Sequence, residues 1–298
     1  MLALVAVPMS ANGEHRLRTT RLSHVALRSE HVARMVEFYE DVLGLRVHEP
    51  LAQGGARLGW GSGHHVLDLL PGEVGLDHYA LEVRDAGGPD GVAARLQAVG
   101  ARPEHRPAEG AHPEAIAVRD PDGNVVELHG RVDRSGEHAA DPGRRPVRVQ
   151  HVTLATRAMD EMVRFYAEGL GFEIADRMED TFTWLRCDTY HHTIAVVLSR
   201  GTGALDHYSY DVEGWADFKT WCDRLGAARV PVCWGPARHG PGNNLFIMFQ
   251  DPDGNRIELS AEMERFWDRT ASYQPRVWAD DPWTINVWGG VGPEWRST

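Results

Sequence analysis

Two histidines and one glutamate occur twice in this sequence, in the same order and inside the same short words. The first set is His24 in LSHVAL, His78 in LDHYALEV and Glu127 in DPDGNVVEL, and the second is His151 in VQHVTLA, His207 in LDHYSYDV and Glu258 in DPDGNRIEL. Two imidazoles and one carboxylate bind one face of a divalent ion and leave the other open, as a non-haem Fe(II) oxygenase requires. The pattern therefore predicts a metal-dependent oxygenase.

The spacing within the two sets argues against coincidence. From the first histidine to the second is 54 residues in one set and 56 in the other, and the glutamates follow after a further 49 and 51. The segment MVEFYEDVLGL returns as MVRFYAEGLGF, and GHHVLDL returns as YHHTIAVV, both offset by 127 residues. A repeat of this length indicates a duplicated domain.

Composition limits the remaining possibilities. A chain of 298 residues is long enough for two domains with buried cores. A net charge of −12 without a basic tract argues against a nucleic acid or an anionic membrane as partner. Three cysteines without a C-x-x-C pair fit a reducing cytoplasm. We interpret residues 1–21 as a disordered leader, and we expect no transmembrane segment.

The elements that must position these residues follow one pattern. The apolar periodicity predicts a strand at 22–28, a helix at 32–43 and strands near 45–48, 56–60 and 65–70. A second series follows, with a strand at 76–83, a helix at 90–99 and strands at 115–119 and 124–128, the last two joined by a D-P-D-G-N turn. Each half is thus predicted to contain two βαβββ units.

We therefore expect an α+β fold of two tandem domains, 20–131 and 147–262, each built from two paired βαβββ modules. Residues 133–145, rich in glycine, proline and charge, are the expected linker. A tail, 263–298, contains Trp267, Trp278, Trp283, Trp288 and Trp295. We expect its indole side chains to be buried, either over the opening of the C-terminal domain or against a neighbouring subunit. We also expect a homo-oligomer.

Paired βαβββ modules around a metal held by His, His and Glu resemble the vicinal oxygen chelate superfamily. The four-module version resembles the type I extradiol ring-cleaving dioxygenases, over about residues 20–262 and most specifically in RHGPGNN followed by DPDGNRIEL. The resemblance implies a catalytic C-terminal domain that binds Fe(II), with Mn(II) as the alternative, through His151, His207 and Glu258. It also implies that His192 is the acid/base residue and that His239 helps to hold the catecholate.

The pair His191 and His192 leaves an alternative open. A neutral imidazole can accept a proton from the substrate and return it as the ring opens. Neighbouring strand residues point to opposite faces, so only one of the two reaches the site. We choose His192, with His191 as the alternative.

One position departs from the family pattern. Extradiol enzymes of this type usually place a tyrosine ten residues before the carboxylate ligand, where this sequence has Met248. A thioether cannot donate a proton. Either His239, Tyr208 or Tyr210 replaces the phenol, or the substrate differs from a simple catechol, or the enzyme is slow on catechols.

Four further residues are candidates for substrate binding. Asn243 in HGPGNN either contacts the substrate or holds a turn. Trp184, Trp234 and Phe246 either line an aromatic pocket or pack in the core.

The sequence therefore predicts an Fe(II)-dependent extradiol dioxygenase that cleaves a catechol-type aromatic vicinal diol with O₂ in aromatic hydrocarbon catabolism. One alternative is a non-redox, glyoxalase-like isomerase or lyase, which commonly uses four protein ligands. Another is a ligand-sequestering resistance protein, but such a protein would have no use for the complete set of three metal ligands. For the first half, where EGAHPEAIAV replaces RHGPGNN, the resemblance implies a metal-free relic, and a structural ion at His24, His78 and Glu127 is the alternative.

Overall fold

The computed structural model describes residues 17–60, 64–84, 87–132, 145–201, 204–267 and 273–289. The first module of the N-terminal half contains β1 (Arg18–Ser29), α1 (Val32–Leu43), β2 (Arg46–Pro50), β3 (Ala56–Gly59) and β4 (Leu67–Pro71). The second contains β5 (Gly75–Arg84), α2 (Gly88–Ala98), β6 (Glu104–Arg106), β7 (Ala115–Arg119) and β8 (Val125–His129). Residues 1–16 of the predicted leader and residues 133–144 of the predicted linker lie outside the described residues.

The C-terminal half repeats this order. Its first module contains β9 (Arg148–Thr156), α3 (Met159–Arg164), β10 (Glu173–Met178), β11 (Phe182–Arg186) and β12 (Ile194–Leu198). The next contains β13 (Ala204–Asp211), α4 (Trp215–Ala227), β14 (Trp234–Arg238), β15 (Leu245–Gln250) and β16 (Arg256–Ala261). The α+β fold of paired βαβββ modules is thus confirmed.

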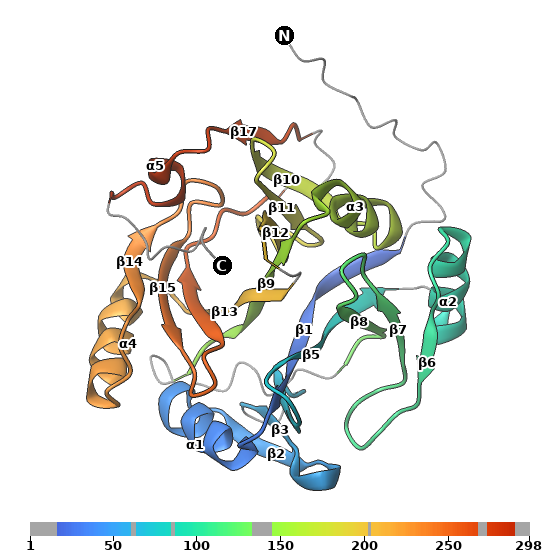
Figure 1. Ribbon diagram of the computed structural model, residues 1–298, viewed down its shortest axis with the longest axis horizontal. Helices are drawn as coiled ribbons and strands as arrows, with labels where there is room; N and C mark the ends of the chain where they lie inside the picture. The colour runs from blue at the N-terminus through green and yellow to red at the C-terminus, as the bar shows by residue number, and fades with distance from the viewer. Residues whose placement is uncertain are drawn as a thin grey trace.

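Within each half, the first strands of the two modules pair at the centre of one sheet. The order is β2-β3-β4-β1-β5-β8-β7-β6 in the N-terminal half and β14-β15-β16-β13-β9-β12-β11-β10-β17 in the C-terminal half (Figure 1). β1 runs antiparallel to β5, and β9 runs antiparallel to β13. The first and last strands of each module are therefore neighbours, and they carry the repeated histidines and glutamates.

Helix α1 illustrates how the sequence sets these elements. Its apolar residues Met35, Tyr39, Val42 and Leu43 recur at helical spacing and are all buried. The helix ends at Gly44, whose left-handed backbone (φ 71°) lets its N–H reach the carbonyl of Glu40. The predicted bounds of this helix agree with the structure. In the C-terminal copy, α3 ends earlier and continues as a π-helical turn at Phe165–Gly169.

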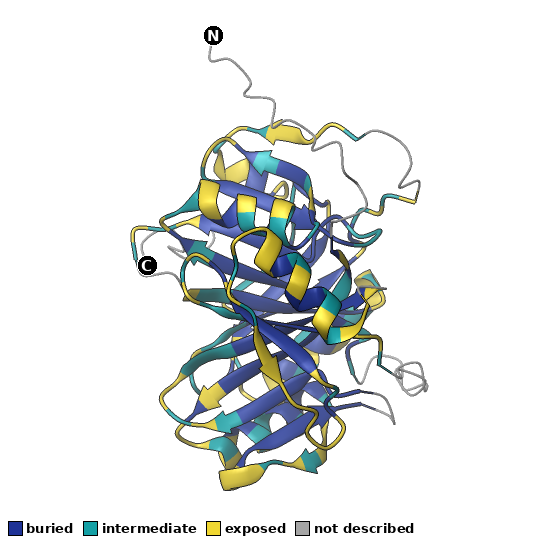
Figure 2. Ribbon diagram, turned by 90° about the vertical axis from the view of Figure 1, so that its right-hand side faces the viewer, coloured by how far each residue is buried: buried dark blue, intermediate teal, exposed yellow. Residues whose placement is uncertain are grey.

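A continuous apolar core extends through both halves, and its strands are largely buried (Figure 2). Two matching clusters join the halves through phenol groups: Tyr39 with Tyr208 and Asp251, and Tyr166 with Tyr79 and Asp120. The Tyr39 hydroxyl donates to Asp251 Oδ2 at 2.8 Å, and the Tyr166 hydroxyl donates to Asp120 Oδ2 at 3.2 Å. Each aspartate begins a D-P-D-G-N turn, so a helix of one half supports a turn of the other.

The described part of the tail packs on the C-terminal domain. Strand β17 (Arg276–Trp278) extends the sheet beside β10, and the short helix α5 (Pro282–Ile285) follows. Trp278 is partly buried, whereas Trp267, Trp283 and Trp288 are at least half exposed. Only one of the described indoles is therefore covered as we expected, and Trp295 lies outside the described residues.

Candidate metal centre and substrate cavity

His151, His207 and Glu258 lie on the adjacent strands β9, β13 and β16, and their side chains converge. The Nε2 atoms of His151 and His207 are 3.3 Å apart, and Glu258 Oε2 lies 3.3 Å from His207 Nε2 and 3.9 Å from His151 Nε2. Ligands bound at about 2.1 Å lie roughly 3.0 to 3.4 Å from one another. Two of the three separations match this range, and the third, between Glu258 Oε2 and His151 Nε2, is longer, so a small movement of the carboxylate would bring all three donors onto one metal ion.

Neighbouring side chains orient these three donors. His151 Nδ1 lies 2.9 Å from Gln150 Oε1, and His207 Nδ1 lies 2.6 Å from Asp206 Oδ1. Because each Nδ1 donates its proton outward, each Nε2 lone pair is directed at the centre. Asn244 donates to Glu258 Oε1 at 3.2 Å and leaves Oε2 for the centre.

The charges also favour a cation. Burial lowers the pKa of His151 to about 3, so this imidazole is neutral. Burial also opposes ionisation of Glu258, but His151, His207 and His239 outweigh it and hold the carboxyl pKa well below its usual range. For His207, Asp206 and Glu258 outweigh burial and raise the pKa to about 9. An ion would therefore displace a proton from His207 and meet an ionised carboxylate.

The histidine pair points in two directions. The His192 ring lies 4.3 Å from the His151 ring between centroids and lines the cavity. His191 points away, with Nε2 3.1 Å from Asp176 Oδ2. The two Nδ1 atoms are 3.0 Å apart, which leaves His192 Nε2 for the cavity. Burial holds the pKa of His192 well below its usual value, so this imidazole is neutral.

His239 follows β14 and reaches the same centre. Its Nε2 lies 3.9 Å from Glu258 Oε2, and its Nδ1 donates to the Ile285 carbonyl at 2.6 Å. The ring stacks on Phe246 with centroids 3.8 Å apart. The tail therefore orients a residue of the site, a contact that the sequence pattern does not reveal.

A cavity with about 500 Å³ of empty space opens beside the three donors. Its apolar walls are formed by Phe182, Trp184, Val197, Trp234, Met248 and Ile285. Phe182 and Trp184 are stacked with centroids 4.1 Å apart. Apolar and aromatic walls of this kind suit a small aromatic ring.

The remaining predicted residues occupy other places. Asn243 is exposed in a turn with a left-handed backbone (φ 51°), and its neighbour Asn244 makes the contact with Glu258. Phe246 supports His239 from behind and does not line the cavity. Tyr208 and Tyr210 are buried in the core. Among the described residues no tyrosine lines the cavity; besides the three donors, its polar lining consists of Thr153, His192, Asp206, His239 and Arg256.

Residues 21–128 and 148–259 each match the profile of the Glyoxalase/Bleomycin resistance protein/Dioxygenase superfamily. The chain belongs to this superfamily. Metapyrocatechase 2 of Cupriavidus necator is 28% identical over 195 residues, which cover 58% of this chain and 60% of that relative. The resemblance to extradiol dioxygenases is thus confirmed at the level of the family.

Solved structures extend the likeness to the whole fold. A Mn(II)-bound glyoxalase from Novosphingobium aromaticivorans superposes with a TM-score of 0.86 at 27% identity, covering 95% of each chain. A variant of homoprotocatechuate 2,3-dioxygenase from B. fuscum gives 0.83 at 25% identity, covering 97% of this chain and 83% of the other. No helix among the described residues is long and apolar enough to cross a membrane.

Proposed function

We propose that this chain is an extradiol-type dioxygenase that opens the ring of a catechol-type vicinal diol with O₂, using Fe(II), or Mn(II) as the alternative. One observation carries the proposal: two histidines and one glutamate converge beside an aromatic-walled cavity that also contains His192 and His239. Metapyrocatechase 2 and the homoprotocatechuate dioxygenase, similar in sequence and fold, support this substrate class. Such a reaction belongs to the breakdown of aromatic compounds.

The donor set explains the choice of ion. A divalent ion on His151, His207 and Glu258 would acidify the hydroxyl groups of the diol and activate O₂. Asp206, Gln150 and Asn244 keep the three donors directed at it. Because all three ligands are buried, this orientation is fixed before the substrate arrives.

The remaining residues bind the substrate and move its proton. The aromatic pair Phe182 and Trp184 with the other apolar walls holds the ring and excludes water. Neutral His192 accepts a proton from the diol at Nε2 and returns it as an acid when the ring opens. His239 Nε2 hydrogen-bonds a substrate oxygen, since Nδ1 is held by Ile285.

Metal analysis after anaerobic purification, followed by oxygen uptake against a panel of catechols, tests the proposal. We expect oxygen consumption matched by a ring-opened product. Glu258→Ala should remove the ion of this centre and the turnover, whereas Glu213→Ala, which changes an exposed carboxylate, should retain both. Full activity in Glu258→Ala, or no oxygen uptake by the iron-loaded enzyme on any catechol, would contradict the assignment.

The alternative candidate is a non-redox, glyoxalase-like isomerase. The similarity to a Mn(II)-bound glyoxalase and Met248 at the usual tyrosine position favour it. Adding a hemithioacetal to the panel separates the two functions, because an isomerase converts it without consuming oxygen.

A further inference from the structure

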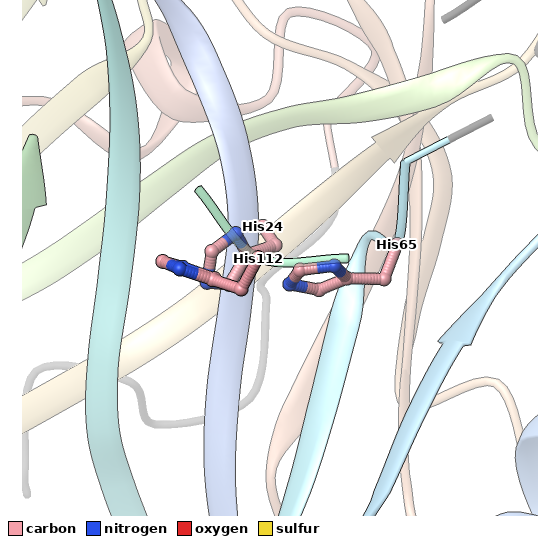
Figure 3. A group of neighbouring side chains, drawn as sticks. All are labelled: His24, His65 and His112. Atoms are coloured by element: carbon pink, nitrogen blue, oxygen red, sulfur yellow. The ribbon is translucent and has the colours of Figure 1, made fainter. Parts of the chain in front are cut away.

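Buried histidines gather in the N-terminal domain around Glu127. They are His24, His64, His65, His78, His112 and His129. Three combinations of this cluster have donor atoms within 4.8 Å of one another. They are His24 with His78 and Glu127, His24 with His65 and His112, and His24 with His64 and His129. Figure 3 shows His24, His65 and His112 gathered in one group. Such a concentration of imidazole has no role in the function proposed for the C-terminal domain.

The cluster reproduces the geometry of the C-terminal centre. The Nε2 atoms of His24 and His78 are 3.2 Å apart, and Glu127 Oε2 lies 3.6 Å from His78 Nε2. Asp77 Oδ1 lies 2.7 Å from His78 Nδ1, and the matching pair of Asp206 Oδ1 and His207 Nδ1 is 2.6 Å apart. The rings of His24 and His65 are 4.3 Å apart, the separation of His151 and His192. The three donors and the aspartate that orients the second histidine are therefore retained.

His112 adds a fourth donor. It lies inside the stretch EGAHPEAIAV and 127 residues before His239, close to the offsets of 129 and 131 that separate the second histidines and the glutamates of the two halves. The sequence patterns assigned no counterpart to RHGPGNN, yet the structure gives His239 a counterpart here. His112 Nδ1 donates to the Pro113 carbonyl at 2.7 Å, and Nε2 lies 3.4 Å from Glu127 Oε2. This donor is closer to its glutamate than His239 is to Glu258.

The arrangement leaves lone pairs facing one another. His78 and His112 donate their Nδ1 protons to Asp77 and to the Pro113 carbonyl, so in the neutral rings both Nε2 lone pairs face the carboxylate of Glu127. Acceptors that converge in a buried site require a cation between them. Bound protons or one metal ion can meet this need; the donor spacings of 3.2 and 3.4 Å match those of ligands on one ion, and the spacing of 3.6 Å is slightly longer.

The surroundings differ from those of the C-terminal cavity. In the matching strand registers, Arg57 replaces Trp184 and Ala117 replaces Met248. The Arg57 guanidinium is buried and paired with Glu49, Asp68 and Glu109. An aromatic slot for a substrate ring is thus missing from the described residues here, and charged groups bound to one another fill its place.

We propose that His24, His78, His112 and Glu127 bind a second divalent metal ion, which stabilises the N-terminal domain and takes no part in turnover. Four buried nitrogen and oxygen donors form a closed site of the structural kind, a coordination that suits Zn(II). This inference does not depend on the reaction proposed for the C-terminal domain.

The test counts metal ions in the full-length, tag-free chain, because a histidine tag binds metal itself. The chain is stripped with a chelator, titrated with Zn(II) and analysed for bound metal per chain. We expect two ions in the wild type, one in Glu127→Ala, one in Glu258→Ala and none in the double variant. His105→Asn, which changes a half-exposed histidine of the same domain, should retain two.

Co(II) provides a second readout that does not depend on the stability of the Glu127 variant. In Glu258→Ala, where only the N-terminal site remains, Co(II) should give the intense visible absorption of a four-coordinate ion and raise the melting temperature. His112→Asn should weaken or abolish this spectrum. One ion per wild-type chain, or a Glu258→Ala protein that binds no Zn(II) and shows no such Co(II) spectrum, would overturn the proposal and leave protons as the buried cation.

Discussion

The carboxylate of Asp176 holds the tail against the C-terminal domain. Replacing Asp176 by asparagine tests whether the tail stabilises the site. The fully buried carboxylate lies 2.8 Å from Trp278 Nε1, 2.9 Å from the Tyr273 hydroxyl and 3.0 Å from the backbone N–H of Arg276. The Arg276 guanidinium and His191 Nε2 contact it as well, at 2.9 and 3.1 Å. Asp176→Asn removes the charge and turns an amide NH₂ toward these donors.

Removing one partner of a buried ion pair costs about 3 to 5 kcal/mol. The lower end applies because Arg276 is partly exposed and retains Glu264 as a partner. A loss of ~3 kcal/mol lowers the melting temperature by about 6 °C in a chain of this size. Tail release would also free His239 from the Ile285 carbonyl, so turnover should fall with the stability.

Burial alone would raise the pKa of Asp176, but His191 and Arg276 outweigh it and hold this pKa well below its usual value. A carboxyl with a lowered folded-state pKa stabilises the fold above its unfolded pKa of about 4 and loses that contribution as the pH falls. The difference between wild type and Asp176→Asn should therefore be constant from pH 7 to 5 and shrink below pH 4.

Thermal melts, limited proteolysis of the tail and turnover measurements form the assay. Asp180→Asn, an exposed neighbour on the same hairpin, is the control and should match the wild type within about 0.5 kcal/mol. An Asp176→Asn protein as stable as this control, with unchanged proteolysis and turnover, would refute the anchoring role.

Three further predictions concern the C-terminal centre. His192→Phe should retain the ion and lower turnover by ~10² or more, the scale of a general acid/base contribution; a near-normal rate in this variant with a large loss in His191→Phe would reverse the assignment. Asp206→Ala should weaken metal affinity by about 10- to 100-fold in equilibrium dialysis, because His207 loses its orienting partner, and unchanged affinity would contradict this. Met248→Tyr should change the pH profile or the range of catechols accepted, and an unaltered panel in a folded variant would show that this side chain does not contact the substrate.

The repeat predicted most of the modules because most of the helices and strands have a clear apolar period. The helix at 32–43 and the strand at 115–119 agree with α1 and β7 to the residue. Strand β6 (Glu104–Arg106) was not predicted, because its three residues are polar and exposed. It forms because β7 offers a free edge, which is a tertiary effect.

The site residues that recur in both halves could be predicted from the sequence. Contacts between segments far apart in the sequence could not. The three donors and the histidine pair follow from the repeat. Ile285 lies in a tail without periodicity, so its contacts with His239 and the cavity were not predicted. The choice between Asn243 and Asn244 depends on the left-handed backbone at Asn243, which leaves the next side chain facing Glu258.

The hydrogen bonds of Tyr39 and Tyr166 connect the two halves in both directions, and they give a reason why both halves remain in one chain. Tyr39 of the first half braces Asp251, which begins the turn leading into the strand of Glu258, and Tyr166 braces Asp120 ahead of Glu127 in the same way. In each half, a tyrosine from a helical segment of the other half thus supports the turn that precedes the carboxylate ligand. If a gene encoded only one half, a second copy of the protein would have to provide that helix. Within the duplicated chain, substitutions at the tyrosine of one half should be accompanied by substitutions at the aspartate of the other half.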